Sequence, residues 1–193
     1  MIPYVKNQAK FKDIEYYLFD ENPYIDEPYG PNWKDMQELF FKAANIPDER
    51  IHIMTSNDWQ DYDNKIRNAG GIDVMVIGLG YDGHFCGNCP RCTPFDSYTY
   101  CIDFKKKQAV NPDYGDRPRQ PHTLTMGPKS LMRVKHLVMI VNGKEKAEIF
   151  KRFLDEPVNQ DVPATILKLH PNFTVICDQA AASLIDPQQY SNL

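Results

Sequence analysis

Residues 71–90 read GIDVMVIGLGYDGHFCGNCP and join a mainly apolar run to a glycine-rich turn. The run Ile72 to Ile77 is rich in β-branched residues, which predicts a central parallel strand buried on both faces. Three glycines follow it, around Asp82 and His84. Ligands of open α/β sheets bind outside the carboxyl ends of the strands. The stretch therefore predicts a ligand site at the end of a central strand.

The composition is typical of a soluble globular protein. The chain has 193 residues, of which 42% are hydrophobic and 25% charged, and its net charge is −4. We expect a single domain over residues 1–193. The net negative charge argues against a nucleic-acid surface. No run approaches the about 18 apolar residues that a membrane span needs, so we expect none. The start lacks the apolar segment of a secretory signal, so the five cysteines predict reduced thiols in a cytoplasmic protein.

Strand-like and helix-like segments alternate along the chain. Such alternation predicts right-handed crossovers and a Rossmann-like α/β fold, a parallel sheet with helices on both faces. The expected strands are Ile14–Phe19, Ile51–Met54, Ile72–Ile77, Asp96–Phe104, His136–Val141 and Phe173–Cys177. The main expected helices are Pro31–Ala44, Trp59–Asn68, Lys144–Leu154 and Val162–Leu169.

Four residues with useful chemistry each follow a predicted strand: Asp20, Asp82, His84 and Lys146. A carboxylate can remove a proton next to a carbonyl, and an imidazole oriented by an acid can serve a ring oxygen or a water. A lysine at a helix start can hold phosphate. Each residue also has an ordinary interpretation, as a turn residue, a helix cap or a solvated lysine.

The chain carries five distinctive motifs: LFDENPY (18–24), FFKAANIPDERIHIM (40–54), GLGYDGHFCGN (78–88), TLTMGPKSLMRVKHLVMIVNGKEKAE (123–148) and VPATILKLHPN (162–172). In this order they resemble motifs of the glucosamine-6-phosphate deaminase and 6-phosphogluconolactonase superfamily. GLGYDGHFCGN is similar to the signature loop of that superfamily, and LFDENPY is similar to its acidic strand end.

The resemblance implies a role for each matching residue. Asp20 matches the general base that moves a proton between the first and second sugar carbons, and Asp82 with His84 matches the pair that opens the sugar ring. The residues expected to bind substrate are Glu21, Gly80, Gly83, Asn88 and Lys146, the last through phosphate. A sugar phosphate is the implied substrate, and neither a redox cofactor nor an obligatory metal is implied.

Two positions depart from the deaminase pattern. Cys89 stands where deaminases carry a glutamate that completes the ring-opening relay, and Pro90 resembles the lactonase version of the loop. Ester hydrolysis of 6-phosphogluconolactone, with His84 activating water, is therefore an alternative. A sensor that binds a sugar phosphate without turnover is another. Arg117 and Arg119 lie in the interval that contains the family's phosphate-binding arginine.

The segment before Asp20 lacks the family's first strand, its phosphate loop and its first helix. We expect a fold without these elements, explained either by a sequence cut short or by a naturally shorter protein. A missing central strand leaves a sheet edge that oligomerisation can cover, so we expect a homo-oligomer.

A metal site is a competing interpretation of the same loop. His84, Cys86, Cys89 and Cys92 follow a spacing that suits a zinc or iron–sulfur site. The run lacks the usual fourth cysteine, and the resemblance already explains Asp82 and His84.

Overall fold

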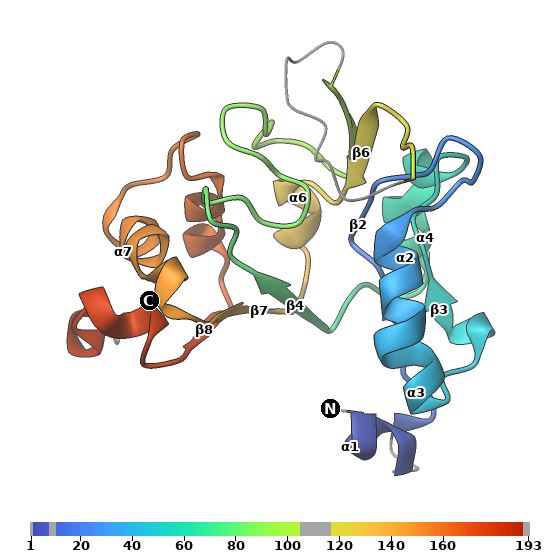
Figure 1. The fold of residues 1–193 in the computed structure, drawn as a ribbon, viewed down its shortest axis with the longest axis horizontal. Helices are drawn as coiled ribbons and strands as arrows, with labels where there is room; N and C mark the ends of the chain where they lie inside the picture. Colours follow the sequence, from blue (N-terminus) through green and yellow to red (C-terminus); the bar gives the residue numbers. More distant parts are fainter. Residues whose placement is uncertain (1, 8–10, 105–116, 191–193) are drawn as a thin grey trace. The chain divides into compact units, whose positions relative to one another are not determined.

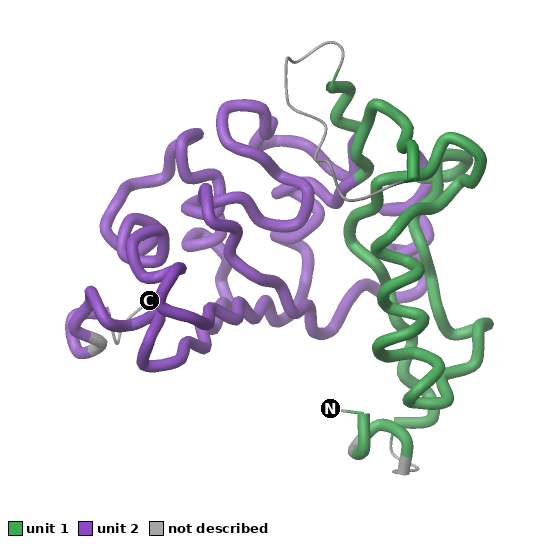
Figure 2. The backbone as a smooth tube through the Cα atoms, in the orientation of Figure 1, with its two compact units in different colours: residues 1–59, 101–124 green, residues 60–100, 125–193 purple. Residues whose placement is uncertain are grey.

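The computed structural model describes residues 2–7, 11–104 and 117–190. It divides into two compact units, shown in Figure 2. Unit 1 comprises Met1–Trp59 and Cys101–Leu124, and unit 2 comprises Gln60–Tyr100 and Thr125–Leu193.

Unit 1 is built on a long helix and short strands. The predicted helix at 31–44 is confirmed: α2, the π-helical turn η2 and α3 follow one another without a break (Figure 1). It ends at Asn45, whose φ of 55° is left-handed. Its apolar side packs in a cluster of Leu18, Phe41, Ala44 and Ile46. The elements are α1 (Ile2–Asn7), β1 (Tyr16–Tyr17), β2 (Asp20–Glu21), α2 (Pro31–Met36), η2 (Gln37–Phe41), α3 (Lys42–Ala44), η3 (Asp48–Arg50) and β3 (Ile51–His52).

The strands of unit 1 are shorter than the sequence predicts. β1 pairs with β3 in parallel, over Tyr16↔Ile51 and Tyr17↔His52 only. A second sheet has the order β2-β6-β5, with β5 at Tyr100–Asp103 and β6 at His122–Thr125, where the chain passes between the units. β2 places Asp20 and Glu21 at consecutive positions of a strand, so their side chains point to opposite faces.

Unit 2 holds a parallel sheet in the order β4-β7-β8. Its register aligns Val74 with His136 and Leu137 with Phe173. The α/β class with parallel strands is confirmed. The elements are η4 (Trp59–Asp61), α4 (Tyr62–Asn68), β4 (Val74–Gly78), α6 (Pro128–Leu131), β7 (His136–Val141), η5 (Lys144–Lys146), α7 (Ala147–Asp155), η6 (Pro163–Leu169), β8 (Phe173–Cys177), η7 (Ala181–Leu184) and η8 (Pro187–Tyr190).

One face of this sheet is packed. The amphipathic helix α7 buries its apolar side, and the ring centroids of Phe153 and Phe173 lie 6.2 Å apart. Met75 and Ile77 of β4 point into the same core, with 5% and 3% of their surface exposed. Helices α6 and α7 both lie on this side (Figure 1).

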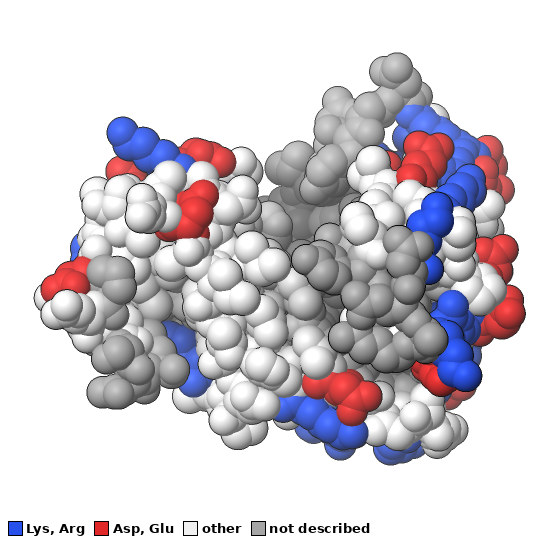
Figure 3. Space-filling model, turned by 90° about the horizontal axis from the view of Figure 1, so that it is seen from below, with Lys and Arg blue, Asp and Glu red and all other residues white. Residues whose placement is uncertain are grey.

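The prediction that β4 is a central strand buried on both faces is wrong. Val74 and Val76 are 56% and 42% exposed, and β4 is an outer strand of the described sheet, with β7 in the middle. Figure 3 views this open side and shows a largely uncharged surface over unit 2. A run of apolar residues indicates only that each of its positions can be buried. Which face is covered depends on the neighbouring elements. Within the described ranges, no helix is long and apolar enough to cross a membrane.

Candidate active site

The loop after β4 is a tight turn. The Gly80 amide donates to the carbonyl oxygen of His84 at 2.8 Å, and the Gly83 amide donates to the Gly80 oxygen at 3.1 Å. Gly83 has φ +88°, a conformation that L side chains rarely adopt. The turn therefore folds back on itself and brings Asp82 and His84 together.

Asp82 and His84 form a paired acid and imidazole. The Asp82 Oδ1 lies 2.6 Å from His84 Nδ1 and accepts the His84 backbone amide at 3.0 Å. The hydrogen bond from the imidazole lowers the pKa of Asp82 to about 2, against the opposing effect of burial. The ionised carboxylate orients the ring through Nδ1, so a proton transfer by this imidazole uses Nε2.

Asp82→Asn is expected to lower kcat about tenfold. A hydrogen bond to a charged group contributes about 1.5–3 kcal/mol, and we take the low end because this pair is partly exposed to solvent. The folded-state pKa lies below the ordinary value of 3.8, so Asp82 stays ionised above pH 5 and loses its charge only as pH falls toward 2. Because the wild-type carboxylate is ionised throughout pH 5 to 8, the loss should be present at every pH in that range in steady-state assays. A loss that disappears within that range contradicts the assignment.

Gly80 makes room for the imidazole. A Cβ at Gly80 would lie 2.1 Å from His84 Nδ1. A Cβ at Gly83 would lie 2.8 Å from a methyl of Val162, the first residue of the VPATILKLHPN motif. The predicted substrate contacts of both glycines stay predictions, while the structure shows the steric reason for each glycine.

Lys146 joins the same loop from another part of the chain. It ends η5, directly after β7, and its Nζ donates to the Leu79 carbonyl oxygen at 2.6 Å. The same Nζ lies 3.4 Å from the ring centroid of Tyr81. Burial lowers the pKa of Lys146, while the negative charge of Asp82 acts in the opposite direction. The loop after β4 thus has an ammonium group beside the acid–imidazole pair.

Asn88 anchors the end of the loop. Its side chain is fully buried, with Nδ2 donating to the Met126 carbonyl oxygen at 2.8 Å and Oδ1 accepting from the Tyr100 hydroxyl at 3.1 Å. Thr125 Oγ1 accepts the Gly87 amide at 3.0 Å. Direct contact of Asn88 with substrate stays a prediction; in this structure its amide holds the loop against the segment after β6.

Tyr81, Tyr100 and Thr125 were not identified from the sequence. The cation–π contact of Tyr81 and the hydrogen bonds of Tyr100 and Thr125 join segments that are distant along the chain. No local pattern marks such residues.

Asp20 and Glu21 of unit 1 make different contacts. Glu21 is buried and accepts the backbone amides of Asn32 at 3.2 Å and Trp33 at 2.9 Å, so it caps the start of α2. Desolvation raises the pKa of Glu21, although these amides act against the rise. Asp20 is half-buried, and its Oδ1 accepts from Asn32 Nδ2 at 2.7 Å.

The arginine candidates lie around one tyrosine of unit 1. Arg117 forms ion pairs with Asp26 at 2.7 Å and Glu27 at 2.6 Å, and its guanidinium lies 4.1 Å from the Tyr24 ring centroid. The guanidinium of Arg119 lies 6.0 Å from the same ring. Two carboxylates therefore already neutralise Arg117 in this structure.

The cysteines of the loop differ from the prediction. Cys89 and Cys92 form a disulfide, so the expectation of reduced thiols is wrong for this pair. Cys86, Cys101 and Cys177 are not in disulfides. Among the described residues, no group of three or more His, Cys, Asp or Glu side chains is placed to hold a metal ion. The alternative site of His84, Cys86, Cys89 and Cys92 is not assembled, because two of its four ligands are joined to each other.

These features define an α/β protein with a hydrogen-bonded aspartate–histidine pair and a lysine at the carboxyl end of a parallel strand. Residues 3–176 match the family of glucosamine-6-phosphate isomerases and 6-phosphogluconolactonases. The glucosamine-6-phosphate deaminase of Clostridium acetobutylicum is 34% identical, over 94% of this chain and 79% of its own. That of Shouchella clausii is 35% identical, over 93% of this chain and 76% of its own. The chain belongs to this family.

Solved structures agree with the fold. A monomeric glucosamine-6-phosphate deaminase superposes with a TM-score of 0.74 at 28% identity, over 90% of this chain and 76% of that one. The 6-phosphogluconolactonase of Thermotoga maritima superposes with a TM-score of 0.69 at 20% identity, over 91% of this chain and 77% of its own. The second likeness supports the fold alone.

Proposed function

We propose that the protein is an enzyme of carbohydrate metabolism that converts glucosamine-6-phosphate to fructose-6-phosphate and ammonia. One observation carries the proposal: the 2.6 Å pair of Asp82 and His84 lies in the glycine turn after β4, where Lys146 also reaches the loop. The pair supplies proton transfer, and the ammonium group suits a phosphate. The similarity to enzymes named glucosamine-6-phosphate deaminase supports the same substrate class.

The proposed chemistry needs one base and one ring-opening group. His84, held by the carboxylate of Asp82, transfers a proton at the sugar ring oxygen and opens the ring to the aldehyde. Asp20 removes the proton on C2 while the aldehyde oxygen gains a proton, which gives an enolamine. Asp20 then returns its proton to C1 and the amine nitrogen releases one, which leaves an imine at C2. Water hydrolyses that imine, so the nitrogen leaves as ammonia and the ketone remains. In this proposal Lys146 holds the phosphate, and no redox cofactor takes part.

The alternative is hydrolysis of 6-phosphogluconolactone. Cys89 favours it, because this chain has no carboxylate there and Cys89 is held in a disulfide with Cys92. In that reaction His84 takes a proton from water as the water attacks the ester carbonyl, and no carbon acid is deprotonated. Asp20 then has no required step.

Assays of the purified full chain on both substrates separate the two functions. We expect release of ammonia and fructose-6-phosphate from glucosamine-6-phosphate, with lactone hydrolysis no faster than in buffer. Lactone hydrolysis without ammonia release favours the alternative. Tight binding of glucosamine-6-phosphate without either product identifies a sensor. A homo-oligomer and a cytoplasmic location stay predictions; one deaminase of known structure is described as monomeric.

A further inference from the structure

The site loop ends in a small covalent ring. Cys89 and Cys92, separated by Pro90 and Arg91, are joined by a disulfide with a Cα–Cα distance of 5.6 Å, which is normal for such a bond. The Thr93 hydroxyl donates to the Cys89 carbonyl oxygen at 2.8 Å and closes the same turn. Both cysteines are half-buried, so part of the ring faces solvent.

The ring holds Arg91 in an unusual conformation and docks it on a distant segment. Arg91 has φ 60°, a left-handed conformation that is uncommon for a residue with a side chain. Its amide donates to the Gln160 carbonyl oxygen at 2.8 Å, and its guanidinium pairs with Asp161 at 2.6 Å. Gln160 Nε2 in turn donates to the Thr93 carbonyl oxygen at 3.0 Å. The ring and the segment 160–161 therefore support each other.

The segment 160–161 is followed by residues that contact the turn carrying Asp82 and His84, which we call the catalytic turn. Val162 packs against Gly83, and the Ala164 amide donates to the Gly83 carbonyl oxygen at 3.0 Å. On its other side the ring follows Asn88, which anchors the loop on Met126. The disulfide thus lies between two anchors of the turn that carries Asp82 and His84.

The size of the ring indicates an exchangeable bond. A disulfide stabilises a fold mainly by restricting the unfolded chain, and a loop this short restricts it little. The spacing Cys-x-x-Cys is instead the spacing of dithiols that take part in thiol–disulfide exchange.

We propose that Cys89 and Cys92 are a redox modification site that reacts with an external dithiol, and that the oxidised form holds the catalytic turn in its active geometry. A thiolate of the dithiol attacks one sulfur, the S–S bond breaks and a mixed disulfide forms. The second thiolate displaces the protein sulfur. Two electrons and two protons pass to the protein, which gains two thiols, and the dithiol leaves as a disulfide.

The effect on activity rests on the proposed deaminase function. In the reduced protein the ring opens, Arg91 can leave its left-handed conformation, and the contacts of Gln160 and Asp161 loosen. Misplacing a catalytic group by about 1 Å can cost up to 10²-fold in rate. We therefore expect reduction to lower kcat by about 10- to 100-fold.

The test compares the full chain oxidised in air with the same protein reduced by dithiothreitol. Three thiols should titrate in the oxidised protein under denaturing conditions, and all five after reduction. Hydrogen exchange at the amides of Arg91 and Ala164 should accelerate on reduction, together with the loss in kcat. Five thiols in the oxidised sample, or unchanged exchange at Ala164, would overturn the proposal.

Two variants make the comparison specific. The double variant Cys89→Ser/Cys92→Ser should resemble the reduced protein and no longer respond to dithiothreitol. Cys177→Ser removes a cysteine that is outside the disulfide, so it should respond as the wild type does. A double variant that still responds refutes the assignment of these two cysteines. If exchange at Ala164 responds while neither redox state releases ammonia, the redox site stands and the proposed function fails.

Discussion

Asp20→Asn is expected to lower kcat for ammonia release by about 10²- to 10⁴-fold, the usual contribution of a general base. Asparagine has nearly the shape of aspartate, but its neutral amide cannot accept the proton from C2. The half-buried carboxylate accepts from Asn32 Nδ2 at 2.7 Å, and the amide oxygen of asparagine can keep that bond. The free energy of unfolding should therefore change little, and steady-state kinetics with urea unfolding would measure both quantities.

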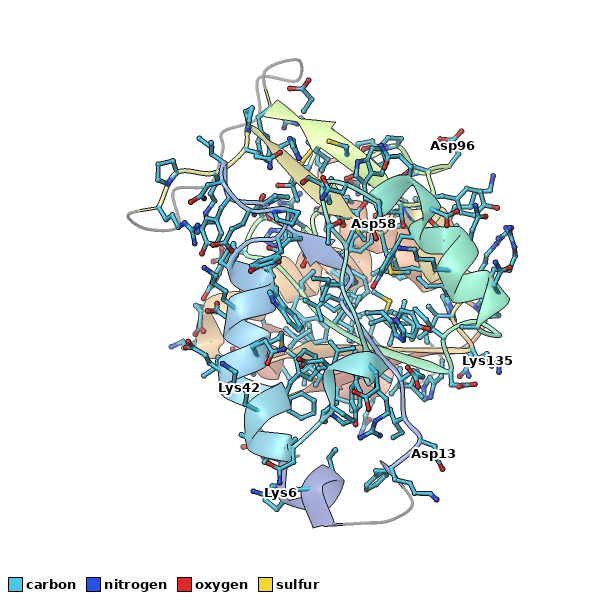
Figure 4. The ribbon with its side chains drawn as sticks, turned by 90° about the vertical axis from the view of Figure 1, so that its right-hand side faces the viewer. Lys6, Asp13, Lys42, Asp58, Asp96 and Lys135 are labelled. Carbon is cyan, nitrogen blue, oxygen red and sulfur yellow. A yellow bond between two sulfur atoms is a disulfide. The ribbon has the colours of Figure 1, made fainter. Side chains whose placement is uncertain are left out.

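Asp13→Asn is the matched control in the same unit. Figure 4 shows Asp13 at the surface of the chain, and its side chain is exposed, so this variant should keep the wild-type kcat. Undiminished ammonia release by Asp20→Asn would rule out the role of Asp20 as the base. If the protein is instead a lactonase, His84→Ala should abolish hydrolysis while Asp20→Asn leaves it nearly unchanged.

Gly80→Ala is expected to lower kcat by about 10²-fold or more, close to the effect of removing the imidazole itself. The new methyl group would lie 2.1 Å from His84 Nδ1 and 2.3 Å from Cε1, so the ring must rotate away. That rotation breaks the 2.6 Å bond to Asp82. Because a partly exposed side chain can give way, thermal unfolding should show a far smaller change than kcat does.

Gly78→Ala provides the matched control, since a Cβ at Gly78 meets nothing within 4 Å. It should retain kcat within about twofold, as expected for a substitution without a new contact. A double variant isolates the mechanism: Gly80→Ala should cost little more when His84 is already Ala, because the two changes disturb one interaction. Full activity of Gly80→Ala, or equal losses at Gly78 and Gly80, would contradict the close approach.

Local patterns predicted the elements that depend on local interactions. The helix at 31–44 has apolar residues at helical spacing, and the parallel strands β7 and β8 match their predicted ranges. The pairing of Asp82 with His84 also follows from the sequence, because a turn rich in glycine keeps residues two apart within reach. The family motifs assign the same residues to the site.

Other features depend on which distant segments meet. The apolar run of β4 reads as buried on both faces, yet Val74 and Val76 are exposed because only one face is covered by described helices. Whether a strand is buried depends on the elements that pack against it, so the sequence of the strand alone does not determine its burial. The contact of Glu21 with substrate stays a prediction, and the structure adds that Glu21 caps α2 through amides eleven and twelve residues farther along the chain.

The sequence by itself determined the α/β class, the family and the turn that carries Asp82 and His84, because these depend on periodicity, glycine placement and local motifs. Only the tertiary structure decided that Lys146 meets Leu79 and Tyr81, that Asn88 is buried as an anchor, and that Cys89 bonds to Cys92. The physical reason is that a contact forms only where the fold brings two groups close together. The spacing of two residues along the chain limits the distance between them but does not determine it.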